Sequence, residues 1–178
     1  MVSADVSARL AWPDDADAVA AVQEAVWRDT GLLEGDAVHD RAAASQAWRA
    51  LLTTPPDARV RVLVALEQTT VRGYCLVHPS HDPDTDRVAD GEVGELAVDP
   101  GQRGAGHGSR LLQAAVDTLR ADGFVRARWW LPTTDDALRS FVTSTGWAPD
   151  GAHRELEAAD GGPRTLKQVR LVTALTDA

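Results

Sequence analysis

The chain has 178 residues, which predicts one compact domain over residues 1–178. Its net charge of −9 excludes nucleic acid as a main partner, because such binding depends on basic side chains. Cys75 is the only cysteine, so an intramolecular disulfide is excluded, and the thiol in its apolar stretch is expected to be buried and inert. Charged residues interrupt the N-terminal segment and every long apolar run. We therefore expect no signal peptide, no membrane partner and a soluble, cytoplasmic protein.

The first half of the chain predicts a strand, two helices and a β-hairpin. In order, these are a strand at residues 6–11, a helix entered at 12–15, a second helix at 36–53, and strands at 59–66 and 71–78. Asp14 or Asp15 can cap the first helix, and Pro55 and Pro56 stop the second. Valines at period two are typical of the first hairpin strand.

The second half begins with an acidic segment at residues 80–91 and then alternates strands with helices. The expected elements are a strand at 92–99, a helix at 106–122, a strand at 124–131, a helix at 135–145, and strands at 153–158 and 167–174. Apolar residues recur on one side of the 106–122 helix, and Gly123 is well placed to end it. The overall order is strand, two helices, three strands, helix, strand, helix, two strands.

The acidic segment resembles the start of a calcium-binding loop in its spacing of Asp82, Asp84 and Asp86. Such a loop needs glycine at its sixth position and glutamate at its twelfth, but this chain has Arg87 and Val93 there. We therefore predict a solvated acidic loop and no metal site. An alternative role is to repel acidic substrates or to attract a cationic amine.

A glycine-rich turn at residues 101–108 is the most informative stretch. It follows a strand ending at Pro100 and precedes an amphipathic helix, with glycines at positions 101, 104, 106 and 108. The first N–H groups of a helix lack internal partners, and the helix dipole places partial positive charge there. Glycines let the backbone approach a ligand closely, and Arg103 adds a guanidinium that can hold a phosphate. This arrangement predicts a phosphate-binding turn.

Common nucleotide-binding motifs do not fit this turn. A P-loop requires lysine after the glycines, whereas Gly108 is followed by Ser109 and Arg110. The dinucleotide fingerprint requires Gly-x-Gly-x-x-Gly, and the third glycine here comes one residue too early. The stretch Arg103-Gly104-Ala105-Gly106-His107-Gly108 instead fits the acetyl-CoA signature Arg/Gln-x-x-Gly-x-Gly/Ala. Together with the element order and the Leu-Ala-Val-Asp-Pro strand end, it resembles the GNAT superfamily of acetyl-CoA-dependent N-acetyltransferases.

The resemblance implies an α/β (α+β) fold of three layers, with a mixed, mostly antiparallel seven-stranded sheet flanked by about four helices. It implies acetyl-CoA as co-substrate, without a metal. Strand residues would bond the pantetheine arm through their backbone, and the glycine turn would hold the pyrophosphate. The cofactor-binding residues implied are Leu96, Ala97, Val98, Arg103, Gly104, Ala105, Gly106, His107, Gly108 and Ser109. For His107, the backbone N–H is expected to matter more than the ring.

The implied reaction is direct attack of a primary amine on the thioester, which requires a base to deprotonate the ammonium. Glu92 and Glu95 are the candidates, and their spacing of three places them on opposite faces of a strand. Glu92 is favoured because several family members carry a base glutamate at the aligned position, and Glu95 is the alternative. The backbone N–H near Leu96 is a candidate oxyanion donor.

The family's usual general acid is a tyrosine in the helix at residues 135–145, but the matching position is Val142. Ser140, Ser144 or Tyr74 is a possible replacement, and water is another, since a CoA thiol is a fair leaving group. Two hypotheses stay open: an N-acetyltransferase, and a non-catalytic acyl-CoA-binding sensor or structural module. The negative charge suggests a cationic small-molecule or peptide amine as acceptor. The superfamily often pairs, which is compatible with a homodimer.

The helices that cover the acceptor side in this family correspond to those carrying Trp27 and Trp48. Both indoles are candidates to line the acceptor cleft, but core packing is the favoured role for each. Trp129 and Trp130 are adjacent in a strand, so they must face opposite sides, and at least one is expected in the core.

Overall fold

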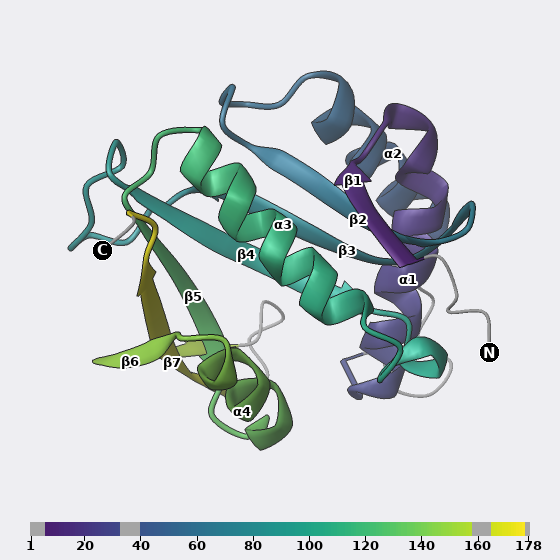
Figure 1. Cartoon of the computed structure of the whole chain (residues 1–178). Coiled ribbons are helices and arrows are strands. Elements are labelled where there is room, and N and C mark those ends of the chain that lie inside the picture. Colours follow the sequence, from purple (N-terminus) through teal and green to yellow (C-terminus); the bar gives the residue numbers. More distant parts are fainter. Residues whose placement is uncertain (1–5, 33–39, 158–164, 177–178) are drawn as a thin grey trace. The chain divides into compact units, whose positions relative to one another are not determined.

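The computed structural model describes residues 6–32, 40–157 and 165–176. The described residues form a mixed seven-stranded sheet of order β1-β2-β3-β4-β5-β7-β6, together with four α-helices and two short 3₁₀ segments (Figure 1). The strands are β1 (Val6–Leu10), β2 (Arg61–Glu67), β3 (Thr70–Pro79), β4 (Asp90–Val98), β5 (Arg126–Pro132), β6 (Ala148–Glu157) and β7 (Thr165–Ala174). The helices are η1 (Pro13–Asp15), α1 (Ala16–Asp29), α2 (Arg41–Thr53), η2 (Pro100–Gln102), α3 (His107–Ala121) and α4 (Asp136–Ser144).

The chain divides into two compact units. One contains Met1–His78 and Glu95–Thr118, and the other contains Pro79–Gly94 and Leu119–Ala178. The boundary falls within β4 and again near the end of α3, so these two elements contribute residues to both units. That residues 1–178 make a single domain stays a prediction.

The first unit has its core between β1–β3 and the helices α1 and α2. β1 and β3 both pair antiparallel with β2. Helix α1 buries the side chains of Val19 and Val22, and α2 buries Trp48, against alternate residues of β2 and β3 such as Val64 and Tyr74. Alternation along a strand places one face of this sheet against α1 and α2. The predicted strands and helices are therefore stable here because the apolar side chains on one face of each pack into a common core.

The opposite face of β3 meets β4 and α3 at Gly73. A Cβ on this residue would lie 2.7 Å from the carbonyl oxygen of Ala97 and 3.0 Å from the Leu111 side chain. The first distance is shorter than real Cβ contacts and involves backbone, which cannot move aside, so glycine is needed where β4 approaches β3. The free thiol of Cys75, next along β3, is fully buried, and burial raises its pKa, as expected for an inert core cysteine.

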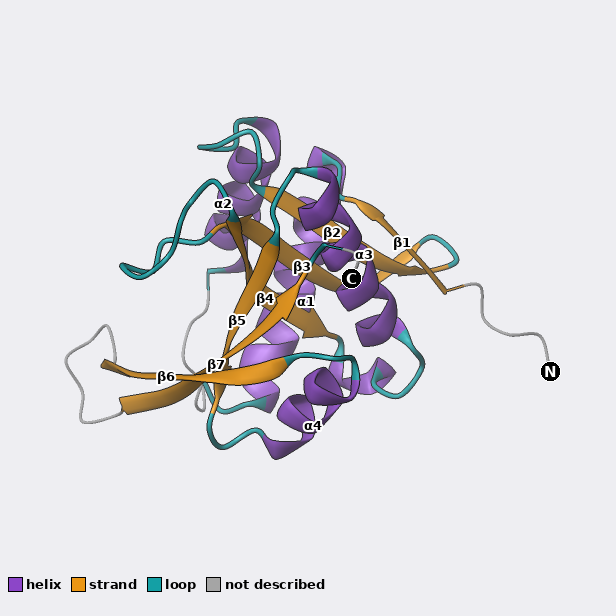
Figure 2. Cartoon of the chain, turned by 60° about the vertical axis from the view of Figure 1, so that its left-hand side comes forward, coloured by secondary structure: helices purple, strands orange, loops and turns teal. Residues whose placement is uncertain are grey.

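The second unit is built on β5, β7 and β6, which lie side by side and antiparallel (Figure 2). The first half of β4 pairs in parallel with β5, from Asp90 opposite Arg126 to Val93 opposite Trp129. Trp129 packs edge-on against Trp147, with ring centroids 6.2 Å apart. Both Trp129 and Trp130 are buried, which confirms that at least one belongs to the core.

Three local expectations change in the structure. Asp15 takes the N-cap position of α1, but its carboxylate accepts hydrogen bonds from Arg9 and from the Trp12 backbone instead of capping the helix. Helix α2 follows the N-cap Asp40, and the expected start at residues 36–39 lies outside the described residues. Strand β6 begins at Ala148, earlier than expected, because pairing with β7 overrides the turn-forming Pro149 and Gly151, with a register shift between Pro149 and His153. The expected last strand residue of β6, Ala158, also lies outside the described residues.

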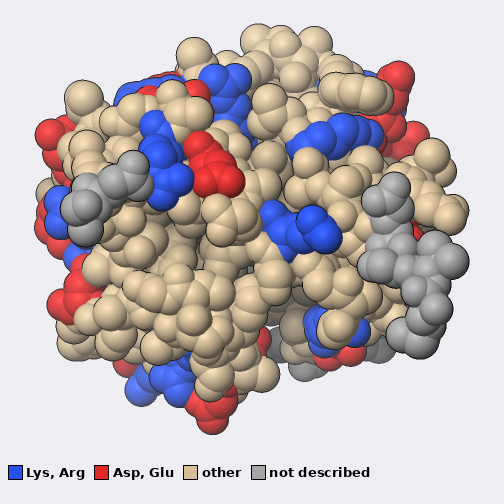
Figure 3. All heavy atoms as spheres, viewed as in Figure 1, with Lys and Arg blue, Asp and Glu red and all other residues tan. Residues whose placement is uncertain are grey.

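The surface carries mixed charge. Basic and acidic side chains are interspersed with uncharged ones on the face drawn in Figure 3. None of the helices in the described ranges is both long enough and apolar enough to cross a membrane. A cytoplasmic location stays a prediction.

Candidate functional site

The glycine-rich turn between β4 and α3 is shaped by its own backbone. Gly104 and Gly106 have φ angles of 80° and 91°, in the region that favours glycine over other residues. At the start of the turn, the Asp99 carboxylate accepts a hydrogen bond from the Gly101 N–H at 3.0 Å, and the Asp99 N–H donates to the Arg72 carbonyl at 2.8 Å. The turn then enters α3 at His107, so the helix N–H groups predicted to hold a pyrophosphate follow the glycines directly.

The predicted turn residues differ in exposure. Residues 103–106 are exposed, whereas the His107 ring is 1% exposed and burial lowers its pKa, which keeps the ring neutral. Neither ring nitrogen of His107 has a hydrogen-bond partner among the described residues. Its contribution to binding an anion would therefore come from the backbone N–H and the helix dipole, as expected.

Arg103 makes an unexpected contact. Its guanidinium forms an ion pair with Asp29, the last residue of α1, with an Nη1–Oδ2 distance of 2.7 Å. Both side chains are about half exposed, so the pair is weak and can exchange with another anion. A phosphate would have to replace Asp29 to be held by the guanidinium in the way that the sequence predicts.

The last residues of β4 carry the predicted pantetheine-binding backbone. Ala97 is buried in the core beneath α1 and α2, whereas Leu96 and Val98 are partly exposed and point to the other face of the strand. Glu95 shares the face of Ala97. This half of β4 therefore presents a carboxylate on one face and leads without interruption into the phosphate turn.

Glu95 lies in a buried polar cluster within the first unit. The Tyr74 hydroxyl donates a hydrogen bond to its carboxylate at 2.7 Å, and Gln23 of α1 is a polar neighbour that lowers the pKa of this carboxyl. Gln23 in turn accepts a hydrogen bond from the Trp48 indole N–H at 3.1 Å, and the Trp48 and Tyr74 rings meet edge-on at 5.1 Å. We call Gln23, Trp48, Tyr74 and Glu95 the Glu95 cluster.

The electrostatics of this cluster suit a proton acceptor. Burial raises the pKa of Glu95, and the hydrogen bond from Tyr74 and the nearby Gln23 amide oppose this rise in part. Burial and the neighbouring Glu95 charge both raise the pKa of Tyr74, so its phenol stays protonated and donates. The site thus combines a partly exposed carboxyl of raised pKa with a phenol that donates to it and a neutral amide nearby.

Glu92, the favoured base in the sequence, has a different environment. It lies in the second unit and is 9% exposed, and its carboxylate accepts a hydrogen bond from the Ser80 hydroxyl at 2.9 Å. Its register partner on β5 is Arg128. A buried carboxylate with a neutral donor is compatible with a base, so Glu92 stays a candidate.

The structure leaves few candidates for the general acid in α4 or at Tyr74. Val142 is fully buried and has no proton to give. The Ser144 hydroxyl donates to the Phe141 carbonyl at 2.6 Å, within the same helix turn, and Ser140 is exposed. The Tyr74 hydroxyl already donates to Glu95.

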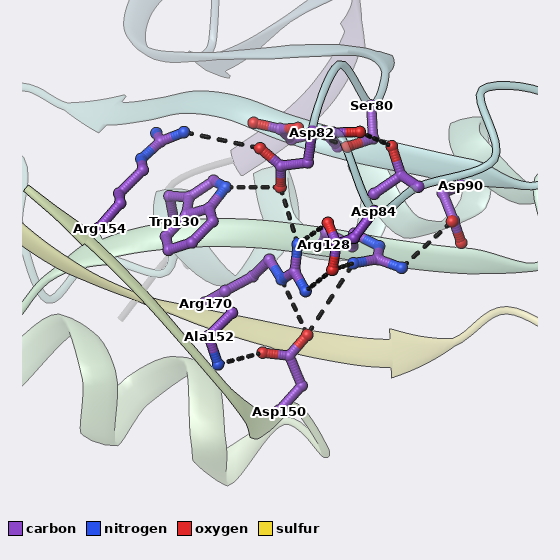
Figure 4. A network of polar contacts seen from close by, with 12 residues as sticks. Ser80, Asp82, Asp84, Asp90, Arg128, Trp130, Asp150, Ala152, Arg154 and Arg170 are labelled. Carbon is purple, nitrogen blue, oxygen red and sulfur yellow. Dashed lines mark hydrogen bonds and ion pairs between the residues drawn. The ribbon is translucent and has the colours of Figure 1, made fainter.

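The acidic loop is not simply solvated, and that prediction is wrong for Asp82 and Asp90. Arg170 of β7 is 5% exposed and holds the Asp84 carboxylate with two hydrogen bonds, at 2.7 and 2.6 Å (Figure 4). The same guanidinium contacts Asp82 at 3.0 Å and Asp150 at 2.8 Å. Buried arginines need carboxylate partners, and the loop supplies them.

The same network continues along β5. Arg128 is also buried and pairs with Asp90 at 3.2 Å, while the Trp130 indole N–H donates to Asp82 at 2.8 Å. Arg154 lies over the Trp130 ring at 4.3 Å. We call Asp82, Asp84, Asp90, Asp150, Arg128, Arg154, Arg170 and Trp130 the arginine network. It attaches the β3–β4 loop to the face of β5, β7 and β6 in the second unit.

Sequence reasoning missed Gln23, Arg128 and Arg170. Gln23 falls on the apolar side of α1, one turn after Val19, and a polar residue at a core position is a recognisable signal. Arg128 and Arg170 interrupt apolar strands, which is also informative. Their partners lie far away in the sequence and could not be identified from it.

The chain resembles known proteins in sequence and in fold. A family model described as the Acetyltransferase (GNAT) family matches residues 19–147. The chain belongs to the GNAT acetyltransferase family. The matched segment includes the glycine-rich turn, both candidate glutamates and the whole Glu95 cluster, so these residues lie within the family's shared region.

Relatives of this GNAT chain include a curated protein from Kineococcus radiotolerans named mycothiol acetyltransferase, 35% identical over 158 residues. That alignment covers 82% of this chain and 50% of the relative, so the chain spans about half of that protein's length. A solved Salmonella typhimurium structure with acetyl-CoA has a TM-score of 0.74 at 21% identity, covering 98% of this chain and 96% of its own. A Brucella melitensis structure named ribosomal-protein-alanine N-acetyltransferase has a TM-score of 0.74 at 20% identity, covering 94% and 98%. The structural likenesses confirm the predicted fold.

Proposed function

We propose that this GNAT protein transfers an acetyl group from acetyl-CoA to a primary amine. The observation that carries the proposal is the run from Glu95 to α3, in which a carboxyl of raised pKa precedes a glycine turn that leads into the N-terminus of a helix. Acetyl-CoA as co-substrate is supported by the family, and by its presence in the Salmonella typhimurium structure.

For the cofactor, we propose that the backbone of Leu96, Ala97 and Val98 bonds the pantetheine arm. The turn from Arg103 to Ser109 would hold the pyrophosphate, and the positive φ angles of Gly104 and Gly106 support this proposal. The Leu96 N–H is the proposed oxyanion donor for the thioester carbonyl.

For the reaction, we propose that Glu95 accepts the proton of the ammonium, directly or through a water molecule. The free amine lone pair then attacks the thioester carbonyl carbon, the C–N bond forms and the C–S bond breaks. The nitrogen of the adduct gives up its second proton to water, and water returns a proton to the departing thiolate, because Val142 cannot supply one and the Tyr74 and Ser144 hydroxyls donate elsewhere. Glu92 is the second candidate base, held by Ser80.

The acceptor is a primary amine on a small molecule or a peptide. Because the Kineococcus radiotolerans relative is named mycothiol acetyltransferase, mycothiol-related amines belong first in an acceptor screen, followed by cationic amines and peptide N-termini. A cytoplasmic location and a homodimer remain part of the proposal.

A second function is favoured by one observation: buried Val142 replaces the family's usual tyrosine acid. On this hypothesis the chain binds acyl-CoA as a sensor or structural module without turnover.

The first test is calorimetric titration with acetyl-CoA of the intact protein and of a variant carrying Arg103→Ala and Gly106→Val. Binding that the variant loses supports the cofactor site, whereas no binding by the intact protein would overturn it. The second test measures amine-dependent release of CoA thiol across the acceptor screen by wild type, Glu95→Gln and Glu92→Gln. Turnover lost only in one glutamate variant identifies the base, and binding without turnover for every amine supports the sensor.

A further inference from the structure

Asp29 lies where α1 ends, and the helix end itself is well defined. The Thr30 N–H and the Thr30 hydroxyl both donate to the Val26 carbonyl at 2.9 Å, and Gly31 follows with a φ of 74°. A glycine of positive φ after the last turn is typical of a helix C-terminus. An acidic side chain is disfavoured at this end, because the helix dipole places partial negative charge there. The stability of α1 therefore gives no reason for an aspartate at position 29.

Arg103, the ion-pair partner of Asp29, is placed by the start of the glycine-rich turn. It follows η2 directly in an extended conformation, with φ of −64° and ψ of 149°, and Gly104 then turns the chain at a φ of 80°. From there the guanidinium reaches the Asp29 carboxylate, with an Nη1–Oδ2 distance of 2.7 Å. Both residues belong to the first unit, so a helix end and a turn far apart in the sequence are joined within it.

The Asp29 carboxylate takes the guanidinium that the proposed pyrophosphate site would use. The N–H groups of a guanidinium bind a carboxylate or a phosphate in the same way, so the two anions compete for Arg103. Because both side chains are about half exposed, water and salt screen the ion pair and a phosphate can displace it. After displacement, the freed carboxylate remains near the phosphate and repels it. Asp29 thus opposes phosphate binding both by holding Arg103 beforehand and by its charge afterwards.

We propose that Asp29 sets the affinity for acyl-CoA, because its carboxylate competes within the same chain with the pyrophosphate for Arg103. This inference rests on the proposed function, in which the glycine-rich turn holds the pyrophosphate. Acetyl-CoA and CoA carry the same pyrophosphate, so the competition weakens the binding of substrate and product alike. Asp29 therefore favours release of CoA after the transfer, and it limits how tightly acetyl-CoA is held before it.

The test measures the dissociation constants of acetyl-CoA and CoA by calorimetry for wild type, Asp29→Asn, Arg103→Gln and the variant with both substitutions. We expect Asp29→Asn to bind both ligands roughly two- to fivefold more tightly than wild type, the change that one exposed ion pair corresponds to. In the Arg103→Gln background most of this gain should be lost, because no guanidinium is left to be freed. The absence of a gain in Asp29→Asn, or an equal gain in both backgrounds, would overturn the inference.

The matched control is Glu24→Gln. It removes the same charge from α1, but from a carboxylate that pairs with Arg28 of the same helix at 2.9 Å. Both dissociation constants should stay at their wild-type values in this variant. A gain equal to that of Asp29→Asn would reveal an effect of net charge alone and would also overturn the inference.

Failure of the proposed function gives a different pattern of results. Without turnover for any amine, the transferase is ruled out, and the calorimetry still decides whether Asp29 competes for Arg103. If wild type binds no acetyl-CoA, the cofactor assignment fails. Titration with inorganic pyrophosphate then decides the inference, followed by the NMR signal of the Arg103 side-chain Nε–H, which is assigned by its loss in Arg103→Gln. Tighter pyrophosphate binding in Asp29→Asn than in wild type supports the competition, and equal or absent binding in both overturns it.

Discussion

The Glu95 cluster and the arginine network both hold carboxylates against buried side chains, but the partners differ. Glu95 has only neutral partners, a phenol that donates to it and a nearby amide, and burial raises its pKa. In the arginine network, the Arg170 fork lowers the pKa of Asp84 to about 2. Asp90 would have a raised pKa from burial alone, but the Asp86 backbone and Arg126 lower it.

This difference in partners separates a carboxyl that can exchange a proton from carboxylates that hold the fold together. A carboxyl with neutral partners in an apolar environment can gain and lose a proton near working pH, which a general base must do. A carboxylate fixed to a buried guanidinium stays ionised, and its value lies in satisfying that guanidinium. The comparison supports the proposed role of Glu95 as the base, and it gives the arginine network the role of attaching the β3–β4 loop.

The largest expected effect is the loss of activity when Glu95 is substituted. Glu95→Gln should reduce turnover by roughly 10²–10⁴-fold, as removal of a general base does, while the affinity for acetyl-CoA is kept. Steady-state kinetics with calorimetric binding of acetyl-CoA measures both quantities. Glu92→Gln is the matched variant on the same strand, and a larger loss there would transfer the base role to Glu92.

The next effect is on stability in the arginine network. Arg170→Met should lower the free energy of unfolding by about 3–5 kcal/mol, because it leaves Asp82, Asp84 and Asp150 without their shared buried partner. Urea unfolding followed by circular dichroism measures the change. Arg28→Met is the control, since its ion pair with Glu24 lies on the surface of α1 and should contribute less than about 1 kcal/mol. Equal losses in the two variants would contradict a special role for the network.

A smaller effect is expected at the phosphate turn. Gly106→Ala adds a side chain at a φ of 91° with open space around it, so the cost is backbone strain of about 1–2 kcal/mol and no steric clash. Acetyl-CoA affinity should therefore fall by roughly tenfold, measured by calorimetry. Gly101→Ala is the control, because its φ is not positive and a Cβ there would make only ordinary contact, at 3.5 Å from Asp99. An unchanged affinity in Gly106→Ala would argue against the turn as the phosphate site.

The smallest effect is the pH dependence that Asp84 gives to stability. Its pKa is lower in the folded chain than in the unfolded one, so its stabilisation is present above about pH 4 and is lost as the pH falls toward about 2. Asp84→Asn should make stability less steeply dependent on pH in that window and should leave activity near neutral pH unchanged. Acid titration of the free energy of unfolding in wild type and variant checks this. An unaltered slope would show that the exposed Asp84 carboxylate is screened by solvent.

The order of the elements and the position of the glycine-rich turn could be predicted from the residues alone. Apolar periodicity defines the strands and helices, and glycines at 104 and 106 dictate the turn, because these are local properties of the backbone. The family resemblance follows from the same local motif. Boundaries shifted where pairing between strands outweighed local turn propensity, as at the start of β6.

The environment of each carboxyl depends on the folded chain. Glu92 and Glu95 are equivalent by residue type, yet one faces a serine and the other a phenol and an amide. The partners of Glu95 come from α1, α2 and β3, and the carboxylates of the β3–β4 loop meet an arginine more than eighty residues away. Proton affinity depends on burial and on such distant neighbours, and both exist only once the chain has folded.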